Sequence, residues 1–358
     1  MALFRDMLGS GESLFRNELA LDYSFIPKLV PYRESEQRQI ASCIKPLFQQ
    51  RSGRNLFICG SPGIGKTVAC RHVLNEIEEQ TDDIIPVYVN CWQHNSSFKV
   101  FLEMCNVIGY KFTQNKRSDE LFMVIKQMLN KKAAVFVFDE IDKLQDYDFL
   151  YMVLEEVHKK TIIAITNERN WLASLDSRIR SRLMPESCEF KPYNSEETKG
   201  ILKQRMEYAF VPGSWDDDAF AVVADKAFEM QDIRRGLFLM RQAALHAEER
   251  ASRKVAKEHV LHALGSLDDF SAGGKDSSGL EEEDRLMLDI IRKNSGQKIG
   301  DLYRAYQEAG GKAVYRTFQR RIDRFEKDRY VVLDRVSGGA EGKTTIVSIV
   351  GDKKLTEF

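Results

Sequence analysis

Residues 55–67, NLFICGSPGIGKT, decide the fold of this 358-residue chain. The segment Gly60–Thr67 fits the pattern G-x-x-x-x-G-K-[ST]. It directly follows a short apolar strand and directly precedes a helix-like segment, which is the context that a phosphate-binding loop requires. Glycines let backbone N–H groups close around phosphate oxygens, and the N-terminus of the helix adds positive potential. This stretch therefore predicts a nucleotide site at the end of a buried strand.

Individual residues of this loop have separate expected roles. The Lys66 ammonium is expected to reach the β- and γ-phosphates, and the Thr67 hydroxyl is expected to ligate Mg²⁺. The predicted cofactors are therefore ATP (or ADP) and Mg²⁺. The nucleotide is expected to contact the residues of the loop and of the first helical turn: Gly60, Ser61, Pro62, Gly63, Ile64, Gly65, Lys66, Thr67 and Val68.

Strands and helices alternate downstream of the loop. Short apolar runs are typical of buried strands, and amphipathic patterns with a helical period lie between them. Strands separated by helices imply a parallel, doubly wound sheet, so the predicted fold class is α/β. The expected strands are residues 84–90, 133–138 and 161–166, and the expected helices are residues 66–79, 97–108 and 118–130.

Two acidic residues end one of the predicted strands, in the segment VFVFDEID (135–142). Asp139 is expected to hold Mg²⁺ directly or through water, and Glu140 is expected to polarise the attacking water as a general base. The alternative is an acidic pair that caps the next helix. Together with the upstream loop, this strand end indicates an ATP or GTP site.

Polar and basic residues after the next strand complete the candidate catalytic set. Asn167 follows that strand directly, so its amide is expected at the same edge of the sheet as Asp139, where it can orient the hydrolytic water. A strand-end cap is the alternative for this residue. The segment LDSRIRSRL (175–183) offers Arg178, Arg180 and Arg182, and an arginine in this region can reach the γ-phosphate of a neighbouring subunit. Solvated basic turns are the alternative for these arginines.

The overall composition excludes several classes of protein. A hydrophobic content of 43% and a charged content of 30% describe a folded protein, neither disordered nor fibrous. Lys and Arg number 53 against 54 Asp and Glu, so any basic surface for a polyanion must be local. No apolar run approaches the roughly 20 residues of a membrane-spanning helix. The N-terminal segment lacks the continuous apolar stretch of a signal peptide, and no membrane partner is expected.

The six cysteines predict a reducing, cytoplasmic compartment. They form no C-x-x-C pattern, and none is spaced with histidine as in a zinc site. Several lie within apolar strand or helix patterns, which favours buried free thiols.

The strand pattern stops after residue 190. Residues 195–264 have the pattern of consecutive helices, and residues 268–279 (DDFSAGGKDSSG) are expected to form a linker because they are rich in Gly, Ser and Asp. Three helical stretches and two strands, VVLDRV and TTIVSIV, follow within residues 280–358. A Gly-rich turn joins the two strands, and this order predicts a winged helix–turn–helix domain.

One helical segment of that domain is basic, because residues 312–335 hold 8 basic and 4 acidic side chains. Val314 and three later apolar residues, Phe318, Ile322 and Phe325, are expected to form one buried stripe. The opposite face could then enter a major groove. A solvated charged helix in a protein-binding module is the alternative. The candidate DNA contacts are Arg316, Gln319, Arg320, Arg324 and, in the wing, Lys343.

From about residue 21 to the C-terminus, the sequence resembles the AAA+ ATPases, and among them the archaeal replication initiators of the origin-recognition and cell-division-control type. The matching segments include PVYVNCWQHNSSFKVFLEMCNVIGY, LDSRIRSRLMPE and DIRRGLFLMRQAALHAEE. By this resemblance, Arg234 contacts an ATP phosphate from a helical lid and Asn167 is the sensor-1 residue. Arg182 is the arginine finger, with Arg178 as the second choice, and residues 26–36 pack beside the adenine.

The resemblance implies an ATP-dependent DNA replication initiator. Such a protein binds duplex origin DNA, helps to recruit and load the replicative helicase, works with other initiator subunits and is associated with the nucleoid. ATP binding and slow hydrolysis act as its switch. The expected domains are an N-terminal tail (1–20), an AAA+ base (21–190), a helical lid (191–267), a linker (268–279) and a winged-helix DNA-binding domain (280–358).

Two other functions remain open on the sequence. The first is a different AAA+ ATPase associated with DNA, such as a clamp loader or an ATPase encoded by a mobile element. The second is an ATP-dependent transcription regulator with a winged helix. The identity of the bound DNA, an origin repeat or a promoter, separates the initiator from the regulator.

Overall fold

The structure is a computed structural model that describes residues 13–272, 282–311, 313–327, 331–336 and 344–349. The chain divides into two compact units, the first ending at Leu264 and the second beginning at Gly265. Within the described residues, no helix combines the length and the apolar character that crossing a membrane requires.

The first unit contains a five-stranded parallel sheet in the order β2-β3-β4-β1-β5. Every residue of β3 is buried, as expected for an inner strand of a sheet that is covered on both faces. The α/β fold class predicted from the alternating pattern is therefore confirmed. The strands are β1 (Leu56–Cys59), β2 (Ile84–Asn90), β3 (Ala133–Asp139), β4 (Lys160–Thr166) and β5 (Glu186–Glu189).

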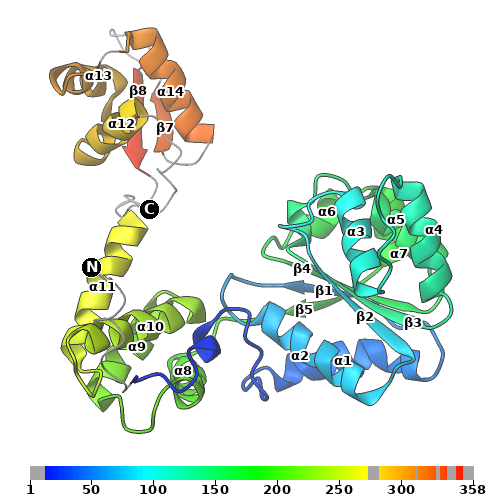
Figure 1. The fold of residues 1–358 in the computed structure, drawn as a ribbon. Helices are drawn as coiled ribbons and strands as arrows, with labels where there is room; N and C mark the ends of the chain where they lie inside the picture. Colours follow the sequence, from blue (N-terminus) through cyan, green and yellow to red (C-terminus); the bar gives the residue numbers. More distant parts are fainter. Residues whose placement is uncertain (1–12, 273–281, 312, 328–330, 337–343, 350–358) are drawn as a thin grey trace, which may run out of the picture. The chain divides into compact units, whose positions relative to one another are not determined.

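Helices cover both faces of this sheet (Figure 1). One face packs against α1 and α2, and the other packs against the helices from α3 to α7. Successive residues of β3 alternate between the two cores, so that Phe136 lies in one and Val137 in the other. The helices are α1 (Glu34–Phe48), α2 (Lys66–Gln80), α3 (Ser97–Val107), α4 (Ser118–Leu129), α5 (Asp148–Glu156), α6 (Trp171–Ser174) and α7 (Ser177–Leu183), with a 3-10 turn at Ile141–Lys143.

The strand β5 was not predicted from the sequence. Its four residues, ESCE, include one fully buried side chain, Cys188, and it pairs with β1 at the edge of the sheet. An edge strand with polar residues on its exposed side lacks the continuous apolar run that marks β3 and β4.

A helical region completes the first unit. Its helices are α8 (Ser195–Ala209), α9 (Asp217–Glu229), α10 (Ile233–Glu249) and α11 (Lys257–Ala272), of which the residues up to Leu264 belong to this unit. The short 3-10 turn Glu18–Leu21 lies against α8 and α10, and Ala20 and Leu21 are buried there. Most of the expected N-terminal tail lies outside the described residues, and its residues 13–20 pack on this helical region.

The expected linker starts too early at residue 268. Helix α11 continues to Ala272, and residues 273–279 lie outside the described residues. The sequence predicts an end of this helix near Leu264 because residues 265–272 (GSLDDFSA) include Gly, Ser and Asp. Ser and Asp are as common in loops as at helix ends.

The second unit has the helix and strand order of a winged helix–turn–helix domain (Figure 1). Its three strands form an antiparallel sheet in the order β6-β8-β7. Tyr306, Phe318, Ile322 and Phe325 are fully buried in its core. The elements are α12 (Glu282–Lys293), β6 (Gln297–Lys298), α13 (Ile299–Glu308), α14 (Tyr315–Lys327), β7 (Val331–Val336) and β8 (Thr344–Ile349).

Val314 does not join the buried stripe of α14. It is 67% exposed, because α14 begins at Tyr315 and Val314 lies in the turn before it. Its carbonyl accepts from the N–H groups of Thr317 and Phe318, at 2.9 and 3.0 Å, and so caps the helix. A helical period predicts a shared face only within the helix.

Helix packing gives a testable contrast between two glycines, one in α10 and one in α11. A Cβ on Gly236 of α10 would lie 2.8 Å from the Leu202 methyls and 2.9 Å from the Ala227 Cβ, whereas a Cβ on Gly265 of α11 would meet nothing within 4 Å. We expect Gly236→Ala to lower the melting temperature, because overpacking costs about 1–3 kcal/mol.

Gly265→Ala is the matched control for this helix-packing prediction. It is expected to raise the melting temperature slightly, because alanine is a better helix former than glycine by about 1 kcal/mol. Thermal unfolding by circular dichroism measures both variants. A rise in both variants would show that α10 is not closely packed against α8 and α9.

Candidate functional site

The predicted phosphate loop lies between β1 and α2, at the carboxyl end of the sheet. Gly63 and Gly65 have φ values of 75° and 87°, which belong to the left-handed region that glycine adopts without strain. The loop borders a cavity of about 480 Å³. Residues of the loop, of three strand ends, of the helical region and of residues 23–31 line this cavity.

Lys66 connects the loop to two strand ends. Its Nζ donates to the carbonyls of Gly60 and Ser61, at 2.9 and 2.8 Å, and to Asn167 Oδ1 at 2.8 Å. The side chain is 7% exposed, and burial lowers the pKa of its ammonium, while the nearby Asp139 acts in the opposite direction. The sequence placed Lys66 and Asn167 at one edge of the sheet, and the structure joins them directly.

Asp139 and Thr67 form the part of the site that suits a divalent cation. Thr67 Oγ1 donates to Asp139 Oδ2 at 2.6 Å, and the Tyr88 hydroxyl donates to the same oxygen at 2.9 Å. Asp139 is 4% exposed. Hydroxyl and carboxylate oxygens beside bound phosphates are the ligands that Mg²⁺ prefers in proteins, so the donor set fits this ion. Thr67 and Asp139 would hold it.

Glu140 follows Asp139 in an unusual backbone conformation. Its φ of 53° and ψ of 45° are left-handed for a residue with a side chain, which costs of order 1 kcal/mol or more. Its side chain borders the cavity. Burial, followed by the charges of Asp139 and Asp142, raises the pKa of the Glu140 carboxyl. The chain thus directs a carboxylate of increased basicity into the cavity.

The helical region reaches the loop through the start of α10. The Asp232 carboxylate caps α10 by accepting from the Arg234 N–H at 2.9 Å, and a Cβ on Gly63 would lie only 2.0 Å from Asp232 Oδ1. The Ile233 N–H donates to the Gly63 carbonyl at 3.3 Å. Arg234 borders the cavity, and its guanidinium pairs with Asp232 at 2.9 Å. Arg234 is therefore within the same cavity as the loop.

The segment before α1 forms another wall of the cavity. Tyr23, Ser24, Pro27, Val30 and Pro31 line it. The last three belong to residues 26–36, the segment expected beside the base of a nucleotide. The segment is held to α8 by the buried guanidinium of Arg205, which donates to the carbonyls of Ala20 and Phe25. Burial lowers the pKa of this Arg205 guanidinium to about 10.

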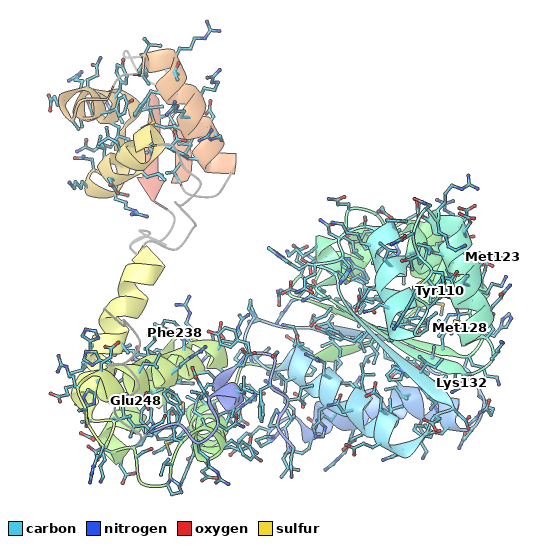
Figure 2. The ribbon with its side chains drawn as sticks, viewed as in Figure 1. Tyr110, Met123, Met128, Lys132, Phe238 and Glu248 are labelled. Carbon is cyan, nitrogen blue, oxygen red and sulfur yellow. The ribbon has the colours of Figure 1, made fainter. Side chains whose placement is uncertain are left out.

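The first described residues of the chain are also bound to α10. Glu248 of α10 (labelled in Figure 2) accepts from the Ser13 hydroxyl and from the Leu14 N–H, both at 2.7 Å. The residues before the cavity wall are therefore bound to the helical region.

The two candidate finger residues lie on α7, away from this cavity. Among the described residues, neither Arg178 nor Arg182 lines it. Arg182 pairs with Glu155 of α5, and Arg178 pairs with Asp176 at 3.1 Å. Both guanidinium groups lie near the Tyr151 ring, at 6.0 Å for Arg178 and 5.1 Å for Arg182. Both arginines are exposed, and neither borders the cavity of its own chain.

The candidate DNA face lies on α14 of the second unit. Arg316 and Arg320 are exposed and Gln319 is half-buried. Arg324 differs, because it pairs with Asp284 of α12, a carboxylate only 1% exposed that also accepts from Arg321 at 2.9 Å. Half of the Arg324 side chain remains exposed. Lys343 lies outside the described residues.

Several residues at the cavity were missed by sequence reasoning. Tyr88 binds Asp139 from β2, Arg71 stacks over the Tyr88 ring at 5.2 Å, and Tyr193 borders the loop. The position of Tyr88 near the carboxyl end of a predicted strand was a usable signal. Arg71 and Tyr193 had none, because their contacts join segments that are distant in the sequence.

Comparisons with known proteins agree with this geometry. The model of the AAA domain family matches residues 49–170, and the model of the Cdc6 AAA+ ATPase-type lid domain matches residues 199–264. The ORC1-type DNA replication protein 2 of Methanothermobacter thermautotrophicus is 28% identical, over 96% of this chain and 94% of its own. The ORC1-type DNA replication protein 2 of Archaeoglobus fulgidus is 29% identical, over 99% and 95%.

A solved structure of the Aeropyrum pernix ORC1 protein in complex with DNA is also similar. It has a TM-score of 0.78 and 27% identity, over 94% of each chain. Cdc6p from Pyrobaculum aerophilum, with a TM-score of 0.64 and 17% identity, shares the fold.

The position of Lys66 predicts the effect of removing it. We expect Lys66→Ala to weaken binding of Mg-ATP by at least about a hundredfold, because the variant loses the buried cation of the phosphate loop. Isothermal titration calorimetry measures the dissociation constant. Lys45→Ala, on α1, is the control and is expected to bind ATP as wild type does. Binding of ATP by Lys66→Ala with wild-type affinity would refute the nucleotide site.

Proposed function

We propose that this chain is an AAA+ ATPase of the archaeal ORC1/Cdc6 type and that it acts as a DNA replication initiator. In this proposal it binds duplex origin DNA through the second unit and helps to recruit and load the replicative helicase. ATP binding and slow hydrolysis in the first unit act as the switch.

One combination of features supports this function most strongly. A cavity lined by a phosphate loop, an acidic strand end and a lid arginine is present in the same chain as a basic α14 in a winged-helix unit. The similar Aeropyrum pernix ORC1 protein, which spans the same two units, was solved with DNA. A clamp loader would not normally end in a winged helix.

Each residue of the site takes a specific role in the proposed reaction. The loop residues from Gly60 to Val68 and Arg234 bind the phosphates of ATP, and Thr67 and Asp139 hold Mg²⁺, which neutralises phosphate charge when bound. Glu140 accepts the proton of the attacking water, and Asn167 orients that water. The Lys66–Asn167 hydrogen bond supports this role, because it holds the amide beside the cation that is proposed to bind the γ-phosphate.

The distance of the finger residues from the cavity favours slow hydrolysis by a single subunit. Arg182, or Arg178 as the second candidate, reaches only the site of a neighbouring subunit, so turnover depends on assembly with another initiator subunit. An exposed arginine held by Glu155 can exchange that carboxylate for a phosphate when the neighbour binds ATP.

The domain division follows from the same proposal. Residues 21–190 form the base, residues 191–267 the lid and residues 280–358 the DNA-binding domain, with the linker shortened by the end of α11 at Ala272. Arg316, Gln319 and Arg320 contact DNA, the arginines through phosphates or guanine edges. A protein with this task acts on nucleoid DNA in the cytoplasm.

Mixing two inactive variants tests whether Arg182 is the arginine finger. We expect Arg182→Ala to lower ATP turnover on DNA by at least about tenfold, since an arginine finger contributes strongly to phosphoryl transfer. Lys66→Ala is expected to be inactive because its binding of Mg-ATP is weakened by at least about a hundredfold. An equimolar mixture of the two is expected to regain turnover, because a Lys66→Ala subunit supplies Arg182 to the ATP of its neighbour.

Arg180→Ala is the control for this mixing experiment, and it is expected to hydrolyse ATP as wild type does. Steady-state phosphate release measures all samples. Absence of recovery in the mixture would show that Arg182 does not act between subunits, and the same mixture with Arg178→Ala then tests the second candidate.

Recovery of genomic DNA fragments by the purified protein with ATP tests the initiator function. We expect strong enrichment of a few intergenic repeats next to replication genes. Replacement of Arg316 and Arg320 by Glu is expected to abolish this enrichment, because two phosphate-binding charges become repulsive. Replacement of Arg292 and Lys293 of α12 by Glu changes the charge equally and is expected to leave it intact.

The other outcomes of the fragment recovery decide against the initiator. Enrichment at scattered promoters would identify a transcription regulator. Absence of enrichment in every variant would show that the second unit binds protein and not DNA.

A further inference from the structure

A buried arginine within residues 26–36 binds a carbonyl of the phosphate loop. Arg33, directly before α1, is 4% exposed. Its Nε and Nη2 donate to the Ile64 carbonyl at 3.2 and 3.0 Å, and Nη2 also donates to the Lys191 carbonyl at 2.6 Å. Its Nη1 pairs with Glu36 at 2.9 Å. One guanidinium therefore joins the segment before α1, the phosphate loop and the segment that leads into α8.

The loop needs such a donor because of its own geometry. A loop that turns its N–H groups toward phosphate turns carbonyls away from it, into the protein. Ile64 lies between the left-handed Gly63 and Gly65 and is 1% exposed. A buried carbonyl without a donor costs about 1–3 kcal/mol. Arg33 supplies two N–H groups to this carbonyl and so stabilises the conformation in which the loop can bind phosphate.

The same guanidinium also contacts aromatic residues next to the loop. Its central carbon lies 3.9 Å from the centre of the Tyr193 ring and 5.1 Å from that of Phe190. The Tyr193 hydroxyl is so close to Gly65 that a Cβ there would lie 2.6 Å from it. Tyr193 precedes Asn194, the N-cap of α8. Arg33 thus holds the loop and the entry to the helical region together.

We propose that Arg33 is a positioning residue for nucleotide binding. It fixes the Ile64 carbonyl away from the cavity, so that the N–H groups of the loop face the phosphates. Among the described residues that line the cavity, Arg33 is absent, so it acts through the loop and not by contact with ATP. The inference rests on the proposed binding of ATP.

The test compares Arg33→Met and Arg33→Lys with a matched control at the other end of the sheet. Lys160 is a half-buried cation that, like Arg33, donates to two backbone carbonyls, here of Leu154 and Val157, at 2.8 and 2.6 Å. Lys160→Met removes two equivalent hydrogen bonds without touching the loop. The full-length proteins are compared by their dissociation constants for Mg-ATP, by kcat and KM for hydrolysis and by melting temperature.

We expect Arg33→Met to raise the dissociation constant and KM for ATP by at least about tenfold, with kcat at saturating ATP unchanged within about twofold. The affinity of Arg33→Lys for ATP is expected to lie between those of Arg33→Met and wild type, because an ammonium can donate to carbonyls but lacks the planar guanidinium that stacks on Tyr193. Lys160→Met is expected to lower the melting temperature and to leave ATP binding unchanged.

The results that would overturn the positioning role of Arg33 differ from the result that would refute ATP binding. Wild-type affinity in Arg33→Met, or a loss of affinity in Lys160→Met that matches its effect, would overturn the positioning role. If Arg33→Met does not fold, wild-type affinity in folded Arg33→Lys would overturn it equally. Absence of ATP binding in wild type would refute the proposed function itself, and the inference with it.

Discussion

The buried ammonium of Lys66 is the interaction on which the nucleotide site depends. It joins the end of β1, through the Gly60 and Ser61 carbonyls, to the end of β4, through Asn167. This contact is possible only because parallel strands end at the same edge of the sheet, next to the start of α2. A cation at this depth loses hydration, and the nearby Asp139 carboxylate offsets part of that cost. A bound phosphate would offset it further.

The rest of the first unit is arranged around this edge. Asp139 receives hydroxyl donors from Thr67 and Tyr88, and the Asp232 cap of α10 lies against Gly63. The loop, the Thr67–Asp139 pair and the helical region are therefore in direct contact, and Gly63 is the loop residue that meets the start of α10. This connection gives a physical basis for ATP as a switch between arrangements of the base and the lid.

Local patterns in the sequence predicted the parts of the structure that short segments determine. The loop motif, the apolar runs of β3 and β4, and the position of Asn167 after β4 identified the cavity correctly. The edge strand β5 was missed because its four residues are mostly polar, and Val314 was misplaced because a helical period does not extend beyond the first residue of α14. The pairing of Arg324 with Asp284 and the contacts of Arg33 join residues 40 and 31 positions apart, which leave no periodic pattern.

A crystal structure with Mg²⁺ and a non-hydrolysable ATP analogue tests the central claim most directly. The account predicts that the triphosphate lies in the loop and that Lys66 Nζ contacts the β- and γ-phosphate oxygens. It also predicts Mg²⁺ beside Thr67 Oγ1 and Asp139, with Arg234 on a phosphate and Arg33 still bound to the Ile64 carbonyl. A nucleotide bound elsewhere, with Lys66 still bonded to Asn167 and both loop carbonyls, would contradict it.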